Sequence, residues 1–225
     1  MKILYEDNHL LAVCKPAGQL SMGDTTGDWT AVDDAADYIK RKYNKPGNVF
    51  VGVVHRLDRP VTGVLLFART SKAAGRLSDQ FRRGTVTKKY LAVVQGHPKN
   101  EATLHDWLLK DRTENRSSVV EESTTGAKRC ELSYRLVARS NQGFTKGLSL
   151  LEVSPATGRS HQIRVQLASR GLAIVGDLKY GAGAGLDDRI LLHATRLEIE
   201  HPVRREPLIL ESAPEGSEWG EFRTS

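Results

Sequence analysis

Runs of apolar and β-branched residues predict that strands make up most of this chain. Runs at residues 2–5 and 10–14 are separated by four polar residues, which predicts a hairpin or two neighbouring strands. Further strand-like runs follow along the chain, at residues 49–54, 63–68, 89–95, 131–138, 147–153, 172–175, 191–199 and 207–210. The runs at residues 49–54 and 63–68 predict two buried strands that bracket a polar segment.

Three segments have the apolar spacing of helices. The first begins near Thr30, a possible N-cap, and carries apolar residues at spacings of three and four. The second starts with Ser71 as its cap and ends at Gly84, and the third covers residues 159–170. Because helices interrupt the strands irregularly, the sequence predicts an α+β fold with a mixed, largely antiparallel sheet flanked by helices.

Composition predicts a folded protein of the cytoplasm, and its basic charge alone is explained better by a solvated basic face than by a nucleic-acid partner. The chain has 225 residues, 33 Lys and Arg against 27 Asp and Glu, and a net charge of +6, which favours polyanions. It shows neither a signal peptide nor an apolar run long enough to cross a bilayer. The two cysteines and seven histidines lack the spacing of metal ligands, so no metal is expected.

The polar segment HRLDRPVTG lies between two predicted strands and holds the first candidate for chemistry. An extended backbone would place Arg56 and Asp58 on the same side. The guanidinium would favour the ionised carboxylate that a nucleophile or base needs. Taken alone, the segment is explained better by a surface ion pair.

The segment GRSHQIRVQLA holds a second candidate. On a helix, His161 and Arg164 would share one face, while Ile163 and Leu167 would share another. A purely structural helix, with its apolar residues in the core and its arginines in water, explains the same pattern.

The segment RRGTVTKKY is a candidate nucleic-acid contact. Arg82, Arg83, Lys88 and Lys89 could hold phosphates, and Tyr90 could stack on a base. By itself Tyr90 fits a core tyrosine better.

Together these segments resemble the RluA family of pseudouridine synthases. The similarity runs from ILYEDNHLLAVCKPAG to LLHATRLEIEHP, and its most specific piece is HRLDRPVTG, followed by GRSHQIRVQLA, GDLKYG and KPAG. The resemblance implies a catalytic domain over residues 1–213 without the N-terminal S4-type RNA-binding domain of many relatives. Residues 214–225 are expected to form a loose tail.

The resemblance also implies roles for individual residues. Asp58 takes the place of the catalytic aspartate, Tyr90 that of the active-site tyrosine, and Arg164 that of the arginine paired with the aspartate. Ile163 would line the pocket, and Arg56 would contact the flipped nucleotide or its neighbours. Phosphate contacts fall to a basic group made up of Arg82, Arg83, Lys88 and Lys89.

Two positions depart from the commonest pattern of the family. Val61 stands where a threonine is frequent, and Gln166 where a histidine is frequent. Neither change touches the expected catalytic groups.

The activity implied is conversion of uridines in ribosomal or transfer RNA to pseudouridine, by a monomer, without cofactor or metal. A glycoside or nucleoside hydrolase would also use an aspartate at an anomeric carbon, but it usually needs a second carboxylic acid, and the motifs offer none. A non-catalytic RNA-binding protein with this fold is the other alternative. Retention of Asp58, Tyr90 and Arg164 together argues against it.

Overall fold

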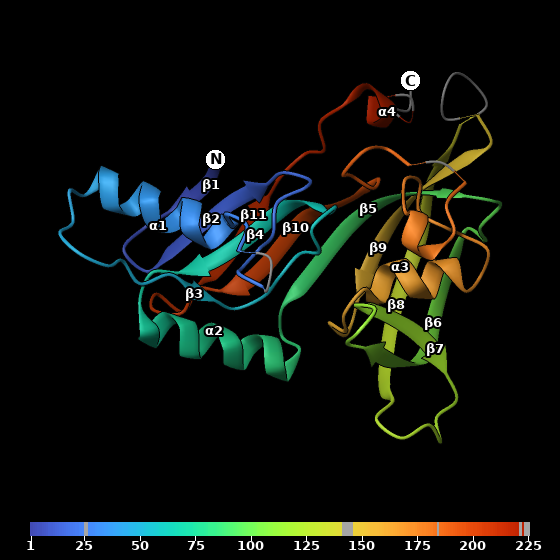
Figure 1. Ribbon diagram of the computed structural model, residues 1–225, viewed down its shortest axis with the longest axis horizontal. Coiled ribbons are helices and arrows are strands. Elements are labelled where there is room, and N and C mark those ends of the chain that lie inside the picture. Colours follow the sequence, from blue (N-terminus) through green and yellow to red (C-terminus); the bar gives the residue numbers. More distant parts are fainter. Residues whose placement is uncertain (25–26, 141–145, 184, 221, 223–225) are drawn as a thin grey trace. The chain divides into compact units, whose positions relative to one another are not determined.

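The computed structural model describes residues 1–24, 27–140, 146–183, 185–220 and 222 (Figure 1). The chain forms two compact units, the first from residues 1–87 and 194–213 and the second from residues 88–193 and 214–225. Strands β5 (Thr87–Gln95) and β10 (Leu192–Glu200) each have residues in both units. Residues 1–213, expected to form one domain, therefore contribute to both.

Strands of the first unit run in the order β1-β2-β4-β10, with β3 beside β4 and β11 beside β10. The pairs β1–β2, β2–β4, β3–β4 and β10–β11 are antiparallel. Besides β10, the strands are β1 (Lys2–Glu6), β2 (Leu10–Lys15), β3 (Gly52–Val53), β4 (Thr62–Ala68) and β11 (Pro207–Glu211).

Two helices of the first unit begin where side chains cap them. At the start of α1 (Ala31–Lys42), the Thr30 hydroxyl accepts from the Asp33 backbone N–H, and the Asp33 carboxylate accepts from that of Thr30, a complete capping box. The predicted N-cap is thus confirmed. Helix α2 (Ser71–Arg83) is capped by Thr70 rather than by Ser71, and it ends at Gly84 as expected.

Strands β2 and β4 are buried on both faces. On one face Ala12 and Leu66 pack with Leu77 of α2. The alternate residues, Leu11 and Phe67, are also fully buried and lie opposite each other in the register. This double burial explains why both strands are continuous apolar runs in the sequence.

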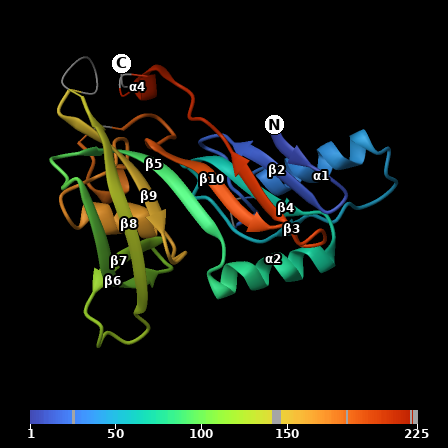
Figure 2. The same cartoon turned by 180° about the vertical axis from the view of Figure 1, so that it is seen from behind.

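Strands of the second unit run in the order β5-β9-β8-β6-β7, and every neighbouring pair in that order is antiparallel (Figure 2). They are accompanied by two helices and a 3₁₀ turn at Leu178–Tyr180. The remaining elements are β6 (Glu101–Asp111), β7 (Arg116–Val120), β8 (Lys128–Arg139), β9 (Leu148–Pro155), α3 (Gln162–Ala168) and α4 (Ser217–Gly220).

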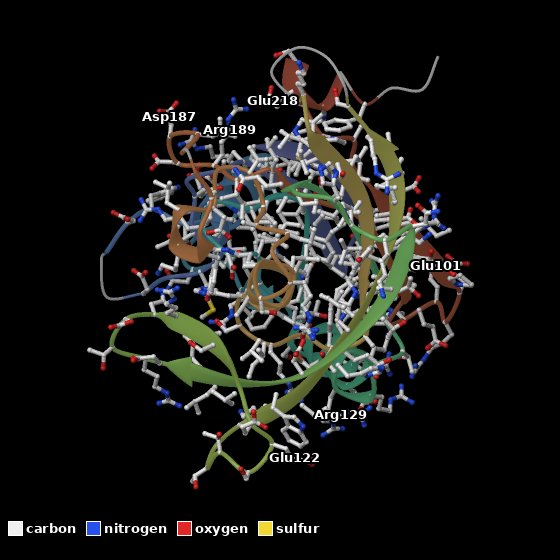
Figure 3. The ribbon with its side chains drawn as sticks, turned by 90° about the vertical axis from the view of Figure 1, so that its right-hand side faces the viewer. Glu101, Glu122, Arg129, Asp187, Arg189 and Glu218 are labelled. Atoms are coloured by element: carbon white, nitrogen blue, oxygen red, sulfur yellow. The ribbon has the colours of Figure 1, made fainter. Side chains whose placement is uncertain are left out.

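The chain after Pro214 belongs to the second unit and packs within it. Phe222 is 5% exposed and lies in a cluster with Val93 and Leu150. Arg189 and Glu218, labelled in Figure 3, form an ion pair. The segment expected to be a loose tail thus supplies a core side chain, Phe222. Residues 221 and 223–225 of that segment lie outside the described residues.

The α+β fold is confirmed, and the structure corrects several local predictions. Strands β6 and β7 were not predicted. Residues 172–175 form only an isolated bridge, through Ile174, and of residues 49–54 only Gly52–Val53 is a strand. The third helix is shorter than residues 159–170 because His161 takes a left-handed conformation, with φ of 56°. None of the helices in the described part of the chain is both long and apolar enough to span a membrane.

Gly63 allows β4 and β10 to approach each other. Its φ is +112°, a conformation that side chains disfavour. A Cβ atom there would lie 2.3 Å from the carbonyl oxygen of Ala194 and 2.7 Å from its nitrogen. Backbone atoms within a strand cannot move far enough to relieve these contacts, so the position requires glycine.

We expect Gly63→Ala to lower the free energy of unfolding by at least about 3 kcal/mol, through strain and overpacking together. Gly75→Ala is the matched control, because Gly75 lies inside α2 and a Cβ added there would meet nothing within 4 Å. This control should stabilise the protein by about 0.5–1 kcal/mol. Urea unfolding of both variants checks the pair, and equal stabilities would contradict the predicted strain.

Candidate active site

Asp58 lies in the loop between β3 and β4. Leu57 is buried, while Arg56 is exposed and Asp58 half-buried, an alternation consistent with an extended stretch. The chain then turns, and the Val61 N–H donates to the Asp58 carbonyl over 3.0 Å. The loop thus holds the Asp58 carboxylate between a buried anchor and a turn.

Two side chains fix the residues before Asp58. The Ser21 hydroxyl donates to the Leu57 carbonyl over 2.7 Å and accepts from the Leu57 N–H over 3.0 Å. His55 accepts from the Leu66 N–H through Nε2 over 2.9 Å, and its ring stacks on Phe81. Each contact joins the loop to a different part of the first unit.

Lys15, from the motif KPAG, fixes the residues after Asp58. Its side chain is fully buried, and the ammonium group donates to the carbonyls of Pro16, Gln19 and Arg59 over 2.7, 2.8 and 3.1 Å. Burial lowers the pKa of Lys15 to about 7, and the opposing attraction of Asp58 raises it. The ammonium therefore ties the end of β2 to the loop of Asp58.

In the second unit, Arg164 forms a buried ion pair that was not predicted. Its Nε and Nη2 donate to the two carboxylate oxygens of Asp177 over 2.7 and 2.8 Å. The two side chains are 6% and 1% exposed. Asp177 follows Gly176, at which a Cβ would lie 2.7 Å from the Arg189 carbonyl oxygen. The motif GDLKYG thus supplies a partner of Arg164, and the motif was the signal available in the sequence.

Tyr180 of the same motif gathers the residues around Arg164. Its ring centroid lies 5.1 Å from the guanidinium carbon of Arg164. Its hydroxyl accepts from the Ser117 N–H over 2.9 Å and lies 2.8 Å from His161 Nδ1. His161 precedes α3 instead of lying on it, so Tyr180, rather than a shared helix face, joins it to Arg164. Ile163 precedes Arg164 on α3 and is 7% exposed.

Side chains alternate between the two faces of β5, so the RNA contacts predicted for the segment RRGTVTKKY do not all lie on one face. Lys88 and Tyr90 point to one face and Lys89 to the other. Lys88 donates to the Thr157 carbonyl over 3.3 Å, and burial lowers its pKa. Lys89 lies 3.6 Å from Glu152, which also pairs with Arg135.

Arg82 and Arg83 lie in the last turn of α2, with side chains 79% and 60% exposed. Both form ion pairs with Asp79, and the Arg83 contact is 2.8 Å. Such exposed pairs contribute little to stability and leave the cations accessible to phosphates.

The predicted site residues are thus shared between the units. Within the described residues, no group of three His, Cys, Asp or Glu side chains is arranged to hold a metal. Pairing of Asp58 with Arg164 stays a prediction. The first unit holds Arg56, Asp58, Arg82 and Arg83, and the second holds Lys89, Tyr90, Ile163 and Arg164.

Residues 9–169 match the family model described as RNA pseudouridylate synthase. The tRNA pseudouridine synthase C of Salmonella typhimurium is 33% identical over 94% of this chain and 85% of its own length. The dual-specificity RNA pseudouridine synthase RluA of Haemophilus influenzae is 32% identical over 92% and 90%. The ribosomal large subunit pseudouridine synthase C of Vibrio vulnificus is 33% identical over 96% of this chain and 66% of its own.

Two solved human proteins have a similar fold. RNA pseudouridylate synthase domain containing 4 gives a TM-score of 0.79 at 22% identity, covering 98% of this chain and 91% of that one. RNA pseudouridylate synthase domain containing 1 gives 0.73 at 26%, covering 95% and 83%.

We expect Lys15→Met to lower the free energy of unfolding by about 2–4 kcal/mol, because three carbonyls lose their buried donor. Between pH 7 and 10.5 the unfolded lysine keeps its proton while the buried one releases it. The unfolded state then binds more protons, so the stability of the wild type relative to Lys15→Met should rise with pH, by up to about 1.4 kcal/mol per unit. Below pH 7 the difference should be constant.

Urea unfolding at several pH values measures this difference. Lys40→Met is the control, since Lys40 is an exposed residue of α1. If the free energy of unfolding changes with pH in the same way for Lys15→Met and the wild type from pH 7 to 10, the buried amine does not titrate in that range.

Proposed function

The chain belongs to the RNA pseudouridylate synthase family and is an RNA pseudouridine synthase, and on this basis we propose that Asp58 is its catalytic carboxylate. The matched range, residues 9–169, includes Asp58, Tyr90 and Arg164. The observation that carries the proposal is the fixed loop around Asp58. Ser21 and Lys15 hold the backbone on either side of it, and Asp58 itself is half-buried. Such preorganisation is what a reacting group needs.

The proposed reaction is an isomerisation. The bond between uracil N1 and ribose C1′ breaks, the base turns, and uracil C5 bonds to C1′. The C5 proton leaves and N1 gains one, so nothing is oxidised or reduced, and no cofactor is proposed. Asp58 acts either as a nucleophile, on the sugar or the ring, or as a base on the sugar.

Three further residues are proposed to act on the same uridine. Arg164 holds Asp58 in its charged form. Its own guanidinium is oriented by the two hydrogen bonds to Asp177, which supports a positioning role. Tyr90 packs against the uracil and assists the late proton transfer, and Ile163 lines the pocket.

We propose that the target uridine is extruded from the RNA before it reacts. Extrusion costs a few kcal/mol, which new contacts must offset. Arg56 is exposed and lies two residues before Asp58, so its side chain can fill the gap or contact neighbouring nucleotides. Arg82, Arg83 and Lys89 are proposed to hold phosphates.

The substrate is proposed to be transfer or ribosomal RNA. Relatives with names of both kinds match this chain at similar identity, 33% in each case. The enzyme is proposed to act as a monomer.

We expect Asp58→Asn to abolish turnover without unfolding the protein, because the amide keeps the shape but cannot act as nucleophile or base. RNA from cells lacking this protein is incubated with each variant, and pseudouridine is mapped by carbodiimide-dependent stops of reverse transcription. The stops produced by the wild type should be missing with Asp58→Asn. Their positions also identify the RNA substrate.

Asp37→Asn is the control, since Asp37 is a half-exposed partner of Arg41 on α1. It should produce the same stops as the wild type. Substantial activity of Asp58→Asn would contradict the assignment, and release of free uracil would point to a hydrolase.

We expect binding of RNA to weaken steeply with salt, and each lost phosphate contact to reduce the slope of log K against log salt by about 0.7–0.9. Arg82→Ala and Arg83→Ala should each show such a reduction. Lys89→Ala should show a smaller one, because Lys89 pairs with Glu152 and faces away from Tyr90. Filter binding at several salt concentrations measures the slopes.

Lys72→Ala is the matched control, because Lys72 is exposed at the opposite end of α2. If neither Arg82→Ala nor Arg83→Ala changes the slope of log K against log salt, these two arginines do not contact RNA phosphates.

A further inference from the structure

Trp29 presents a large aromatic surface to solvent, with a relative exposure of 64%. It precedes Thr30, the N-cap of α1. An apolar residue at this position commonly packs against the fourth residue of the helix as a hydrophobic staple. Here the fourth residue is Asp34, so the usual apolar partner is missing. Helix capping therefore does not account for the exposed ring.

The indole ring is nevertheless held in one orientation. Its Nε1 donates to Asp34 Oδ1 over 2.7 Å. The other oxygen of Asp34 accepts from Gln19 Nε2 over 2.9 Å, so the carboxylate is itself fixed. The ring edge is bonded while the ring stays largely accessible. A ring held in this way loses little conformational entropy when a ligand stacks on it.

The segment of Trp29 is joined directly to the loop of Asp58. Asp28, immediately before Trp29, forms an ion pair of 2.8 Å with Arg59, immediately after Asp58. Arg59 Nε also donates to the Gly18 carbonyl over 2.9 Å. One ion pair thus links the neighbours of the exposed indole and of the proposed catalytic carboxylate, within the first unit.

We propose that Trp29 stacks on an unpaired base that flanks the target uridine. The inference rests on the proposed function, since it requires an RNA whose reacting nucleotide lies at Asp58. Sequence-specific recognition of RNA mainly uses unpaired bases, and aromatic side chains stack on them whatever their identity. Arg59 is exposed next to Asp58, and although it pairs with Asp28 its guanidinium can also reach an adjoining phosphate.

Steady-state kinetics test the proposal, with tritium release from RNA labelled at uridine C5 and isolated from cells lacking this protein. Trp29→Ala should raise KM about 5- to 100-fold, as loss of one stacked base does, and leave kcat within about two-fold. Trp29→Phe should retain most of the affinity. Trp29→Leu, which is apolar but not aromatic, should behave as Trp29→Ala does.

Phe50→Ala is the matched control, because Phe50 is another exposed aromatic residue of the first unit, at 50% exposure. Its KM should stay within about two-fold of the wild-type value. Fluorescence gives a second readout: adding the same RNA should quench the wild-type emission, and Trp29→Phe should lose most of that quenching even though Trp107 and Trp219 remain.

Different results overturn the two proposals. If the wild type releases no tritium, the proposed function fails. If the wild type is active while Trp29→Ala has an unchanged KM, or while Trp29→Leu binds as well as Trp29→Phe, stacking is wrong. A change in oligomeric state of Trp29→Ala without a change in KM would instead assign the ring to a protein contact.

Discussion

The ammonium group of Lys15 lies at the end of β2 and donates to three backbone carbonyls, one of them belonging to Arg59 next to Asp58. An isolated buried cation is costly, and only this full set of acceptors makes its burial tolerable. The chain can satisfy the ammonium only when the segment after β2 and the loop of Asp58 take their observed conformations. Burial of the Lys15 amino group thus makes the geometry of that loop a condition of folding.

The second unit also depends on a buried ionisable group, but there the group is a carboxylate and its partner is a cation. Asp177 is almost completely buried and is acceptable there because Arg164 contacts both of its oxygens. Tyr180 then ties this pair to β7 through Ser117. In both units a buried charge, rather than apolar packing alone, sets the positions of the residues proposed to act on RNA. Such sites tolerate little substitution, because removing one partner leaves the other buried and unpaired.

The sequence predicted elements where one local signal dominates, such as the helix that begins at the N-cap Thr30 and the apolar strands β2 and β4. Strand β6 was missed because Asp106 points inward among apolar residues and breaks the alternation. Its carboxylate is satisfied there by Gln166 and Arg170, which lie about sixty residues later. Motifs likewise identified Asp58 and Arg164 as candidates. They could not show that Lys15 or Asp177 supports them, because those contacts exist only after folding.

The interval between Asp58 and Gly63 is fixed at both ends. A turn closes on the Asp58 carbonyl, and Gly63 lies against the backbone of Ala194. Most surface loops accept insertions and deletions during evolution. Here one additional residue would have to displace either the carboxylate or strand β4. Divergence among homologous chains should therefore change the identity of residues 59–62 while preserving their number, and variation in length should collect in other loops.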